Sequence, residues 1–381
     1  MAGPLSGIRI VELAGIGPGP FSGMLLSDLG ADIIRVDRAN QVNPVNFDKP
    51  NLEPMYRGRR SIGADLKNPD GVETVLRLIE RADALIEGFR PGVTERLGLG
   101  PDVCLGRNPR LVYGRMTGWG QEGPMAQAAG HDINYIALAG ALAHFGRAGG
   151  KPTPPINLVG DFGGGGMFMA LGIVSGILEA RSSGKGQVID VAMVDGAAVL
   201  MTMMWGLRKI GFWDEALGNN VLDTGAPFYD TYETSDGKFI SLGSLEPQFY
   251  AELIDRLGLV DEGLPVQMDR AGWDALRTRF TALFKTRTRD EWDAVLKGSD
   301  ACYAPVLTMS EALHDEHLQA RGTFIDRVGV PQPAPAPRYS RTVAEVERDA
   351  PWPGQHTDEA LVDWGFAPAE ITKLRAKGAL G

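Results

Sequence analysis

Cysteine and histidine are scarce in this chain of 381 residues, and an excess of positive charge is missing altogether. The two cysteines, Cys104 and Cys302, show no metal-binding spacing, so we expect two reduced thiols and no metal site. The net charge of −10 argues against nucleic acid as the main partner, because binding to a phosphate backbone needs a basic face. A small anionic ligand is not excluded, since it needs only a local group of arginines.

A long apolar run is also lacking. The longest, residues 167–178, is shorter than the roughly 20 residues that a membrane span needs, and it predicts a buried helix. The N-terminal residues carry neither the basic nor the apolar segment of a secretory signal. We therefore expect no membrane span and a cytoplasmic location.

Alternating strand and helix patterns in the first half of the chain predict a parallel sheet with helices on both faces, an α/β fold. The expected strands are 8–13, 31–36, 84–87, 111–115 and 187–193. The expected helices are 21–29, 71–81 and an apolar helix that ends near residue 208. The pattern then changes to an Asp-Gly hairpin, a capping box from Thr288 to Glu291 and further helices, which predict a second, smaller α+β domain.

The glycine-rich loop after the first strand, residues 15–23, departs from a dinucleotide-binding loop. The third glycine of the G-x-G-x-x-G pattern would fall on Pro20. Pro18 and Pro20 also lack the N–H groups that would bind a pyrophosphate. We expect a tight turn beside some other ligand.

Basic residues gather near the N-terminus of this acidic chain. They are Arg35, Arg38, Arg57, Arg59, Arg60, Lys67, Arg90 and Arg96. Several stand at or after predicted strand ends, where ligands of parallel α/β sheets bind, and guanidinium groups suit phosphate oxygens. The alternative is a solvated face of unrelated charges, and the spacing leaves both open.

The most specific candidates are an imidazole and a carboxylate, His131 and Asp161, each beside a glycine-containing turn and ahead of a helical segment. An acid and a base on opposite sides of one carbon can invert it by proton transfer. Asn157 could orient the carboxylate. The alternatives are a packed or capping histidine and a helix-capping carboxylate.

Two further groups favour simpler explanations. His314 and His317 share a helix face, but no third ligand follows at a convincing spacing, which favours a solvated face. Four methionines between residues 193 and 204 predict core filling or an adaptable surface for apolar chains.

Taken together, these segments resemble the alpha-methylacyl-CoA racemases, members of the family III CoA-transferase superfamily, over nearly the whole chain. The specific parts are residues 64–67, 87–92, 130–135 and 158–161 with the glycines that follow. The resemblance implies an interlocked homodimer whose active sites lie where the large domain of one subunit meets the small domain of the other. It implies a large Rossmann-like CoA-binding domain (1–210 and 331–381), a small α+β domain (225–325), and linkers (211–224 and 326–337).

By the same resemblance, His131 and Asp161 are the acid–base pair, and Glu246 hydrogen-bonds the histidine from the small domain. The implied coenzyme A contacts are Arg38, Ala64, Asp65, Leu66, Lys67, Gly88, Phe89, Arg90, Arg96, Gly130, Asp132, Ile133, Asn134 and Tyr135. Phe89 replaces a tyrosine of some relatives, which keeps a backbone contact and removes any phenol contact.

We therefore predict an isomerase that interconverts the 2R and 2S forms of 2-methylacyl-CoA thioesters through an enolate. Neutral His131 takes the α-hydrogen from one face and protonated Asp161 delivers one to the other, without a metal or redox cofactor. Backbone N–H groups at the start of the Asp161 helix would hold the enolate oxygen.

Two alternatives stay open. The first is a family III CoA-transferase, in which the carboxylate of Asp161 accepts the acyl group and no histidine is required at 131. The second is an acyl-CoA-binding protein without activity. Branched fatty acyl, sterol side-chain and aryl-propionyl groups all fit as the acyl group.

Overall fold

The computed structural model describes residues 3–381, which form two compact units. The first unit contains the residues up to Ala139 together with 156–200 and 316–381, and the second contains 140–155 and 201–315. The first segment of the predicted large domain ends at residue 210, and the predicted small domain begins at 225. In the structure, the chain passes from one unit to the other after residues 139, 155, 200 and 315. The predicted boundaries therefore differ from this division at every crossing.

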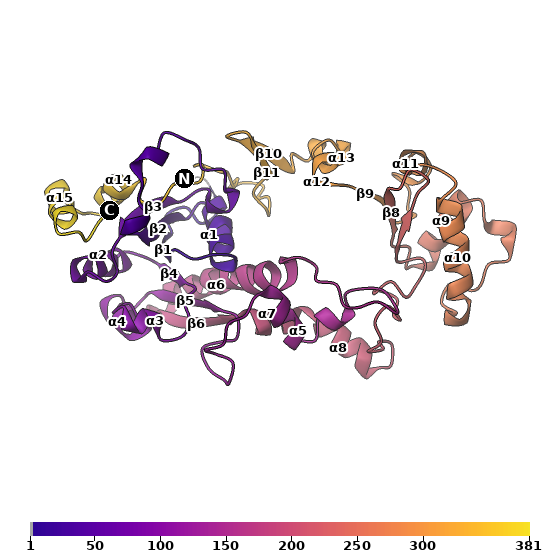
Figure 1. Ribbon diagram of the computed structural model, residues 1–381, viewed down its shortest axis with the longest axis horizontal. Coiled ribbons are helices and arrows are strands. Elements are labelled where there is room, and N and C mark those ends of the chain that lie inside the picture. Colours follow the sequence, from indigo (N-terminus) through magenta and orange to yellow (C-terminus); the bar gives the residue numbers. More distant parts are fainter. Residues whose placement is uncertain (1–2) are drawn as a thin grey trace. The chain divides into compact units, whose positions relative to one another are not determined.

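The first unit is built on a six-stranded sheet in the order β3-β2-β1-β4-β5-β6, with all strands parallel. The strands are β1 (Arg9–Leu13), β2 (Asp32–Arg38), β3 (Arg60–Ala64), β4 (Ala84–Glu87), β5 (Val112–Thr117) and β6 (Gln187–Ala192) (Figure 1). The predicted parallel α/β sheet is confirmed. The order of strands reverses between β1 and β4, and such a switch point is where ligands of these folds bind.

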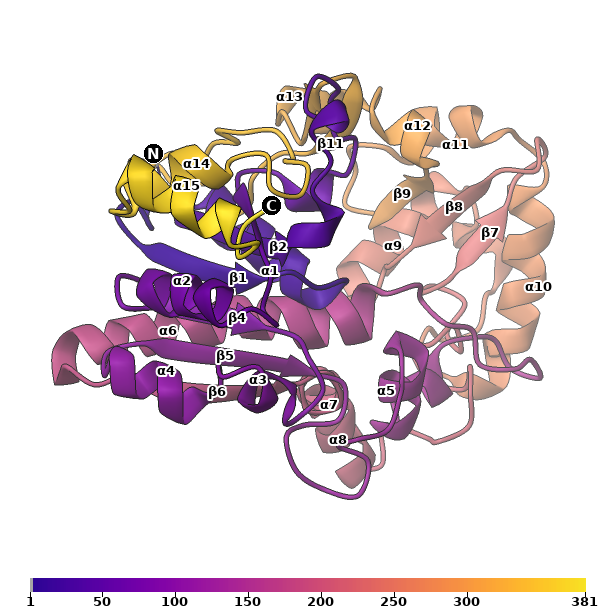
Figure 2. The same ribbon diagram turned by 60° about the vertical axis from the view of Figure 1, so that its left-hand side comes forward.

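Helices cover both faces of this sheet. On one face lie α2 (Pro69–Ile79), α4 (Pro101–Arg107), α14 (Thr357–Asp363) and α15 (Pro368–Ala376). Figure 2 shows α14 and α15 side by side. On the other face lie α1 (Pro18–Asp28), α5 (Asp132–Leu138) and α6 (Phe168–Ser183). Fully buried strand residues such as Ile10 and Ile34 anchor these two layers, and each such side chain contributes about 1.5–3 kcal/mol.

The remaining elements of the first unit are α3 (Val93–Arg96), α7 (Met193–Leu200), α13 (Glu316–Ala320) and the hairpin of β10 (Phe324–Arg327) and β11 (Val330–Pro333). Part of the segment 326–337, expected to be a linker, belongs to this hairpin, since β11 covers residues 330–333. A π-helix, Leu158–Met167, leads directly into α6.

The second unit combines an antiparallel sheet with helices, as the α+β pattern predicted. Its strands are β7 (Thr231–Glu233), β8 (Phe239–Leu242) and β9 (Tyr303–Val306). Its helices are α8 (Thr202–Lys209), α9 (Pro247–Arg256), α10 (Trp273–Phe284), α11 (Arg289–Leu296) and α12 (Met309–Ala312). An apolar core formed largely by α9, α10, α11 and the sheet includes Phe280, Phe284 and Trp292.

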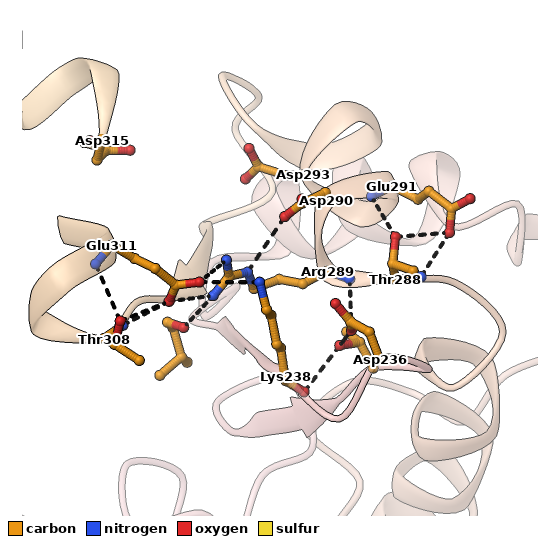
Figure 3. Close-up of polar contacts among 12 residues, drawn as sticks. Asp236, Lys238, Thr288, Arg289, Asp290, Glu291, Asp293, Thr308, Glu311 and Asp315 are labelled. Carbon is orange, nitrogen blue, oxygen red and sulfur yellow. Dashed lines mark hydrogen bonds and ion pairs between the residues drawn. The ribbon is translucent and has the colours of Figure 1, made fainter. Parts of the chain in front are cut away.

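An ion-pair network ties the start of α11 to the other elements of the second unit (Figure 3). The buried guanidinium of Arg289 donates to both carboxylate oxygens of Glu311, at 2.7 and 3.0 Å, and to the carbonyl of Val306. Glu311 also pairs with Lys238 at 3.1 Å and accepts the Thr308 N–H. The guanidinium of Arg289 and these hydrogen bonds hold the pKa of Glu311 far below its usual value. Glu311 therefore stays ionised, and the network stays intact, at all ordinary pH values.

One continuous helix, residues 158–183, is long and apolar enough to cross a membrane by length and composition alone. It is the π-helix joined to α6, and it is longer than the apolar run that the sequence suggested. Met169, Ile173 and Ile177 on its inner side pack into the core of the first unit. A core helix passes the same test, so the finding is weak evidence for a span.

Candidate active site

The carboxyl edge of the parallel sheet brings together several residues that the resemblance assigns to coenzyme A. Arg38 ends β2 and Ala64 ends β3, and the two are paired in the strand register. Residues 65–67 follow β3, where the Asp65 N–H donates to the Ala379 carbonyl at 2.9 Å. Gly88, Phe89 and Arg90 follow β4, next to the switch point of the sheet. This edge therefore carries exposed basic side chains at or after the ends of β2, β3 and β4, and the loop after β1 lies between those after β2 and β4.

The basic residues near the N-terminus do not form one surface. Arg38, Lys67, Arg90 and Arg96 are exposed, and within residues 3–381 none of them takes part in an ion pair. Arg35, Arg57, Arg59 and Arg60 are buried, each paired with a carboxylate: Asp37, Asp28, Glu12 and Asp32 respectively. For these four, neither alternative left open by the spacing holds, because the side chains are buried and their guanidinium groups are already paired within the protein.

A buried ion-pair network supports the loop after β4. The Glu87 carboxylate accepts the Phe89 N–H at 2.7 Å and an Arg115 Nε–H at 2.9 Å. Arg115 also pairs with Glu95 of α3, the residue directly before Arg96. No role was predicted for Glu87, Arg115 or Glu95. Glu87 and Arg115 occupy paired positions on adjacent strands, and two opposite charges at a shared strand register are a signal for such a pair.

The glycine-rich loop after β1 lies beside Asp161. A Cβ on Gly17 would stand 3.5 Å from Asp161 Oδ2. Gly17 has φ 68°, a value that favours glycine, and α1 begins at Pro18, three residues earlier than predicted. Proline at the first helical position needs no N–H partner, which explains the early start.

His131 is the exposed N-cap residue of α5, and its own N–H donates to Asn134 Oδ1 at 3.1 Å. The loop before it is tightly packed: Tyr135 donates its hydroxyl to the Gly130 carbonyl and meets Trp119 edge-on at 4.8 Å. A Cβ on Gly130 would lie 2.7 Å from the Tyr135 ring, so glycine is required there. Burial raises the pKa of Tyr135 to about 12, so it stays a hydroxyl that supports the loop.

Asp161 lies inside the π-helix Leu158–Met167, whereas the sequence predicted that it would precede the helix; the helix begins earlier than predicted. Its carboxylate accepts a hydrogen bond from Asn157 Nδ2 at 2.6 Å, the contact that the sequence suggested. Burial raises its pKa, the Asn157 bond lowers it, Asp132 raises it and His131 lowers it, and the net direction is upward. The net effect favours the protonated form of the carboxyl group.

The backbone N–H of Asp161 is not available to an enolate oxygen, because it donates to Asp132 Oδ1 at 2.7 Å. Of the N–H groups at the start of this helix that were expected to hold the enolate oxygen, that of Asp161 is therefore excluded. Asp132 itself is buried, with 3% of its surface exposed, and its side chain points toward Asp161. Ile133 and Asn134, next to it on α5, are exposed.

Glu246 belongs to the second unit, where it is exposed and forms the N-cap of α9 without a side-chain capping bond.

The methionines divide between the two roles considered for them: Met193 is buried in the core of the first unit, and Met203 is exposed on α8. Within the part of the chain that the structure describes, no group of three His, Cys, Asp or Glu side chains is arranged to hold a metal ion.

Comparisons with known proteins identify the family of this chain. The sequence model of CoA-transferase family III matches residues 5–357. An alpha-methylacyl-CoA racemase of Mus musculus is 48% identical over 98% of this chain and 96% of its own length. Its counterpart in Homo sapiens is 44% identical with the same coverage. A crystal structure of a CAIB/BAIF family protein from Brucella suis superposes with a TM-score of 0.79 over 96% of this chain and 100% of that chain, at 28% identity.

Proposed function

The chain belongs to CoA-transferase family III, and we propose that within this family it is an isomerase that interconverts the 2R and 2S forms of 2-methylacyl-CoA thioesters. The observation that carries the proposal is that the Asp132 carboxylate joins the segments of His131 and Asp161, in a chain that is 48% and 44% identical to two racemases along nearly its whole length. A transferase that uses Asp161 as an acyl acceptor has no need of an imidazole at position 131.

The thioester makes the reaction possible by acidifying the α-hydrogen, since the enolate spreads its charge onto the carbonyl oxygen. Neutral His131 removes the hydrogen from one face and protonated Asp161 delivers one to the other, and the reverse reaction exchanges these roles. The raised pKa of Asp161 suits this role, because a larger fraction of the carboxyl group stays protonated near neutral pH. Neither proton transfer requires a metal or redox cofactor.

The enolate oxygen needs a donor other than the Asp161 N–H. The first N–H groups of α5, those of Asp132 and Ile133, adjoin His131 and have no backbone or side-chain acceptor within residues 3–381. We assign them this role. One such donor typically stabilises the developing charge by about 3–4 kcal/mol.

We propose a homodimer in which Glu246 of the partner subunit orients His131. An exposed apolar stripe on the outer side of the continuous helix 158–183 supports a partner of the same chain: Met167, Leu171, Val174 and Leu178 recur at helical spacing, and Leu171 and Leu178 are 64% and 71% exposed. Exposed apolar patches of this kind mark interfaces. Glu246 is also exposed, and as the N-cap residue of α9 its side chain makes no capping hydrogen bond. Its carboxylate therefore has no competing role at the start of its own helix.

Deuterium wash-in tests the reaction. Incubation of one epimer in deuterium oxide, with no acceptor acid, should place deuterium at the α-carbon and yield both epimers. His131→Ala and Asp161→Ala should each abolish wash-in while binding of the CoA thioester persists, and the exposed control His314→Ala should behave as wild type. Exchange of CoA that depends on an added acid, without wash-in, would establish a transferase instead. Binding without either reaction would establish a binding protein.

Co-expression tests the shared site. A dimer of one His131→Ala chain and one Glu246→Ala chain contains one intact site if each site combines residues of two subunits. Random assembly then restores about a quarter of the wild-type activity. Two inactive parents that give an inactive mixture would show that both residues act within one subunit.

A further inference from the structure

Asp132 joins the two segments that carry the proposed acid and base. It is the first residue of α5, directly after His131, and its carboxylate turns inward to accept the N–H of Asp161 through Oδ1 at 2.7 Å. Only 3% of Asp132 is exposed, and within residues 3–381 its Oδ2 is buried with no hydrogen-bond partner. A carboxylate held so far from water, with one oxygen unpartnered, is expensive to keep in a core, which points to a functional role.

The backbone is shaped to allow this contact. Gly160 lies directly before Asp161, and a Cβ at that position would stand 2.5 Å from Asp132 Oδ1 and 3.2 Å from the Asp132 carbonyl oxygen. No real Cβ tolerates the first distance, so glycine is required for the carboxylate to reach the N–H. The residue type at 160 and the orientation of Asp132 thus serve one contact.

We propose that Asp132 is a positioning residue for the proton transfer: its Oδ1 fixes the backbone of Asp161, and its negative charge stands beside the carboxyl group of that residue. The inference rests on the proposed racemase function. It concerns the side chain of Asp132 and is separate from the role assigned to its backbone N–H.

Electrostatics favour the same role. Burial is the main cause that raises the pKa of Asp161, and the charge of Asp132 adds to it, against the Asn157 amide and the His131 imidazole, which lower it. Tyr135, on the same helix, stays neutral. The helices α1 and α7 also pack against the π-helix, and in the described chain neither supplies a charge that shifts the Asp161 pKa. Asp132 therefore favours the protonated form of Asp161, the form that delivers the proton.

Two substitutions separate the bond from the charge. Asp132→Asn keeps an oxygen that can accept the Asp161 N–H and removes only the charge, whereas Asp132→Ala removes both. Asp190→Asn is the matched control, because Asp190 is an exposed carboxylate that likewise accepts a backbone N–H, that of Gln121, at 3.0 Å. Wash-in rates across pH and the Kd of the CoA thioester are measured for all three.

For Asp132→Asn we expect the acid limb of the kcat/KM profile to move to lower pH by on the order of one unit, since the acid–base pair loses its first proton more readily without the neighbouring negative charge. For Asp132→Ala we expect the same shift and a kcat that is about 10- to 100-fold lower, because small displacements of a reacting group cost rate steeply. The Kd should change less than twofold in both. Asp190→Asn should leave the profile and kcat unchanged.

The inference is overturned if Asp132→Asn leaves the acid limb where it is, or if Asp132→Ala keeps the kcat of the Asp190→Asn control. Should Asp132→Ala fail to fold, Gly160→Ala replaces it, since the added Cβ displaces Oδ1 while the charge remains; this variant must lower kcat without moving the acid limb. A wild-type protein that shows no wash-in at all would refute the proposed function itself, a result distinct from any of these.

Discussion

Eight basic residues near the N-terminus separate into two sets of four, and the contrast between the sets shows how one residue type serves two purposes. Arg35, Arg57, Arg59 and Arg60 are buried, and each pairs with a carboxylate at 2.5 to 2.8 Å. Arg38, Lys67, Arg90 and Arg96 lie at the carboxyl edge, exposed. Desolvated charges need partners within the protein, whereas exposed charges are free to meet a ligand. Removal of the first kind should affect stability, and removal of the second kind should affect binding.

The largest effect on stability should come from Arg59, which is fully buried and pairs with Glu12 at 2.7 Å. Arg59→Met leaves the Glu12 carboxylate buried without a partner, so we expect a loss of about 3–5 kcal/mol in the free energy of unfolding. Urea denaturation measures it. The double variant Glu12→Leu, Arg59→Met should recover much of the loss, because no unpaired charge remains. A loss below about 1 kcal/mol for the single variant would contradict the assignment of Arg59 to the buried set.

Arg115 combines features of the two sets, because it is buried with carboxylate partners and also supports the exposed loop after β4. Arg115→Met removes a partner from the buried Glu87, whose carboxylate also holds the Phe89 N–H, and from the exposed Glu95. We expect a loss of about 1.5–3 kcal/mol in stability together with a several-fold rise in KM for CoA thioesters and little change in kcat.

The control for this variant is Arg107→Met. Arg107 also pairs with two glutamates, Glu73 and Glu80, but all three side chains are largely solvated. Its loss should cost less than about 1 kcal/mol and leave KM unchanged. Equal effects of the two variants would remove Arg115 from any role in the loop.

Much of the first unit was predictable, because its strands and helices follow simple patterns. Apolar runs such as those of β1 and β4 are typical of strands buried on both faces of a parallel sheet. β3 was missed, since its sequence, Arg-Ser-Ile-Gly-Ala, holds one large apolar residue, and its burial depends on partners such as Asp37 for Ser61 that lie far along the chain. The π-helix around Asp161 was missed because its glycines signal flexibility and not a particular helical form.

The candidate site shows the same limit. Asn157 was linked to Asp161 from their spacing of four residues, and the bond is present. The sequence could not show that Asp132 would turn inward, or which arginines would be buried, because both depend on contacts between segments that are remote in sequence. Glu12 and Arg59 are 47 positions apart, and nothing local distinguishes that arginine from Arg38.

Arg38, of the exposed set, should have the smallest effect on stability and a clear effect on binding. Arg38→Ala should change the free energy of unfolding by no more than about 0.5 kcal/mol, because the side chain is exposed at the end of β2. Loss of one charge-assisted hydrogen bond to phosphate, about 1.5–3 kcal/mol, should raise KM for a CoA thioester roughly 10- to 150-fold, with kcat nearly unchanged. The pantetheine thioester of the same acid lacks the nucleotide phosphates, so its kcat/KM should be the same in both proteins. Arg110→Ala, an exposed arginine before the amino end of β5, should affect neither substrate. Equal losses for the two thioesters would show that Arg38 acts elsewhere than on phosphate, and the exposed set would lose its proposed purpose.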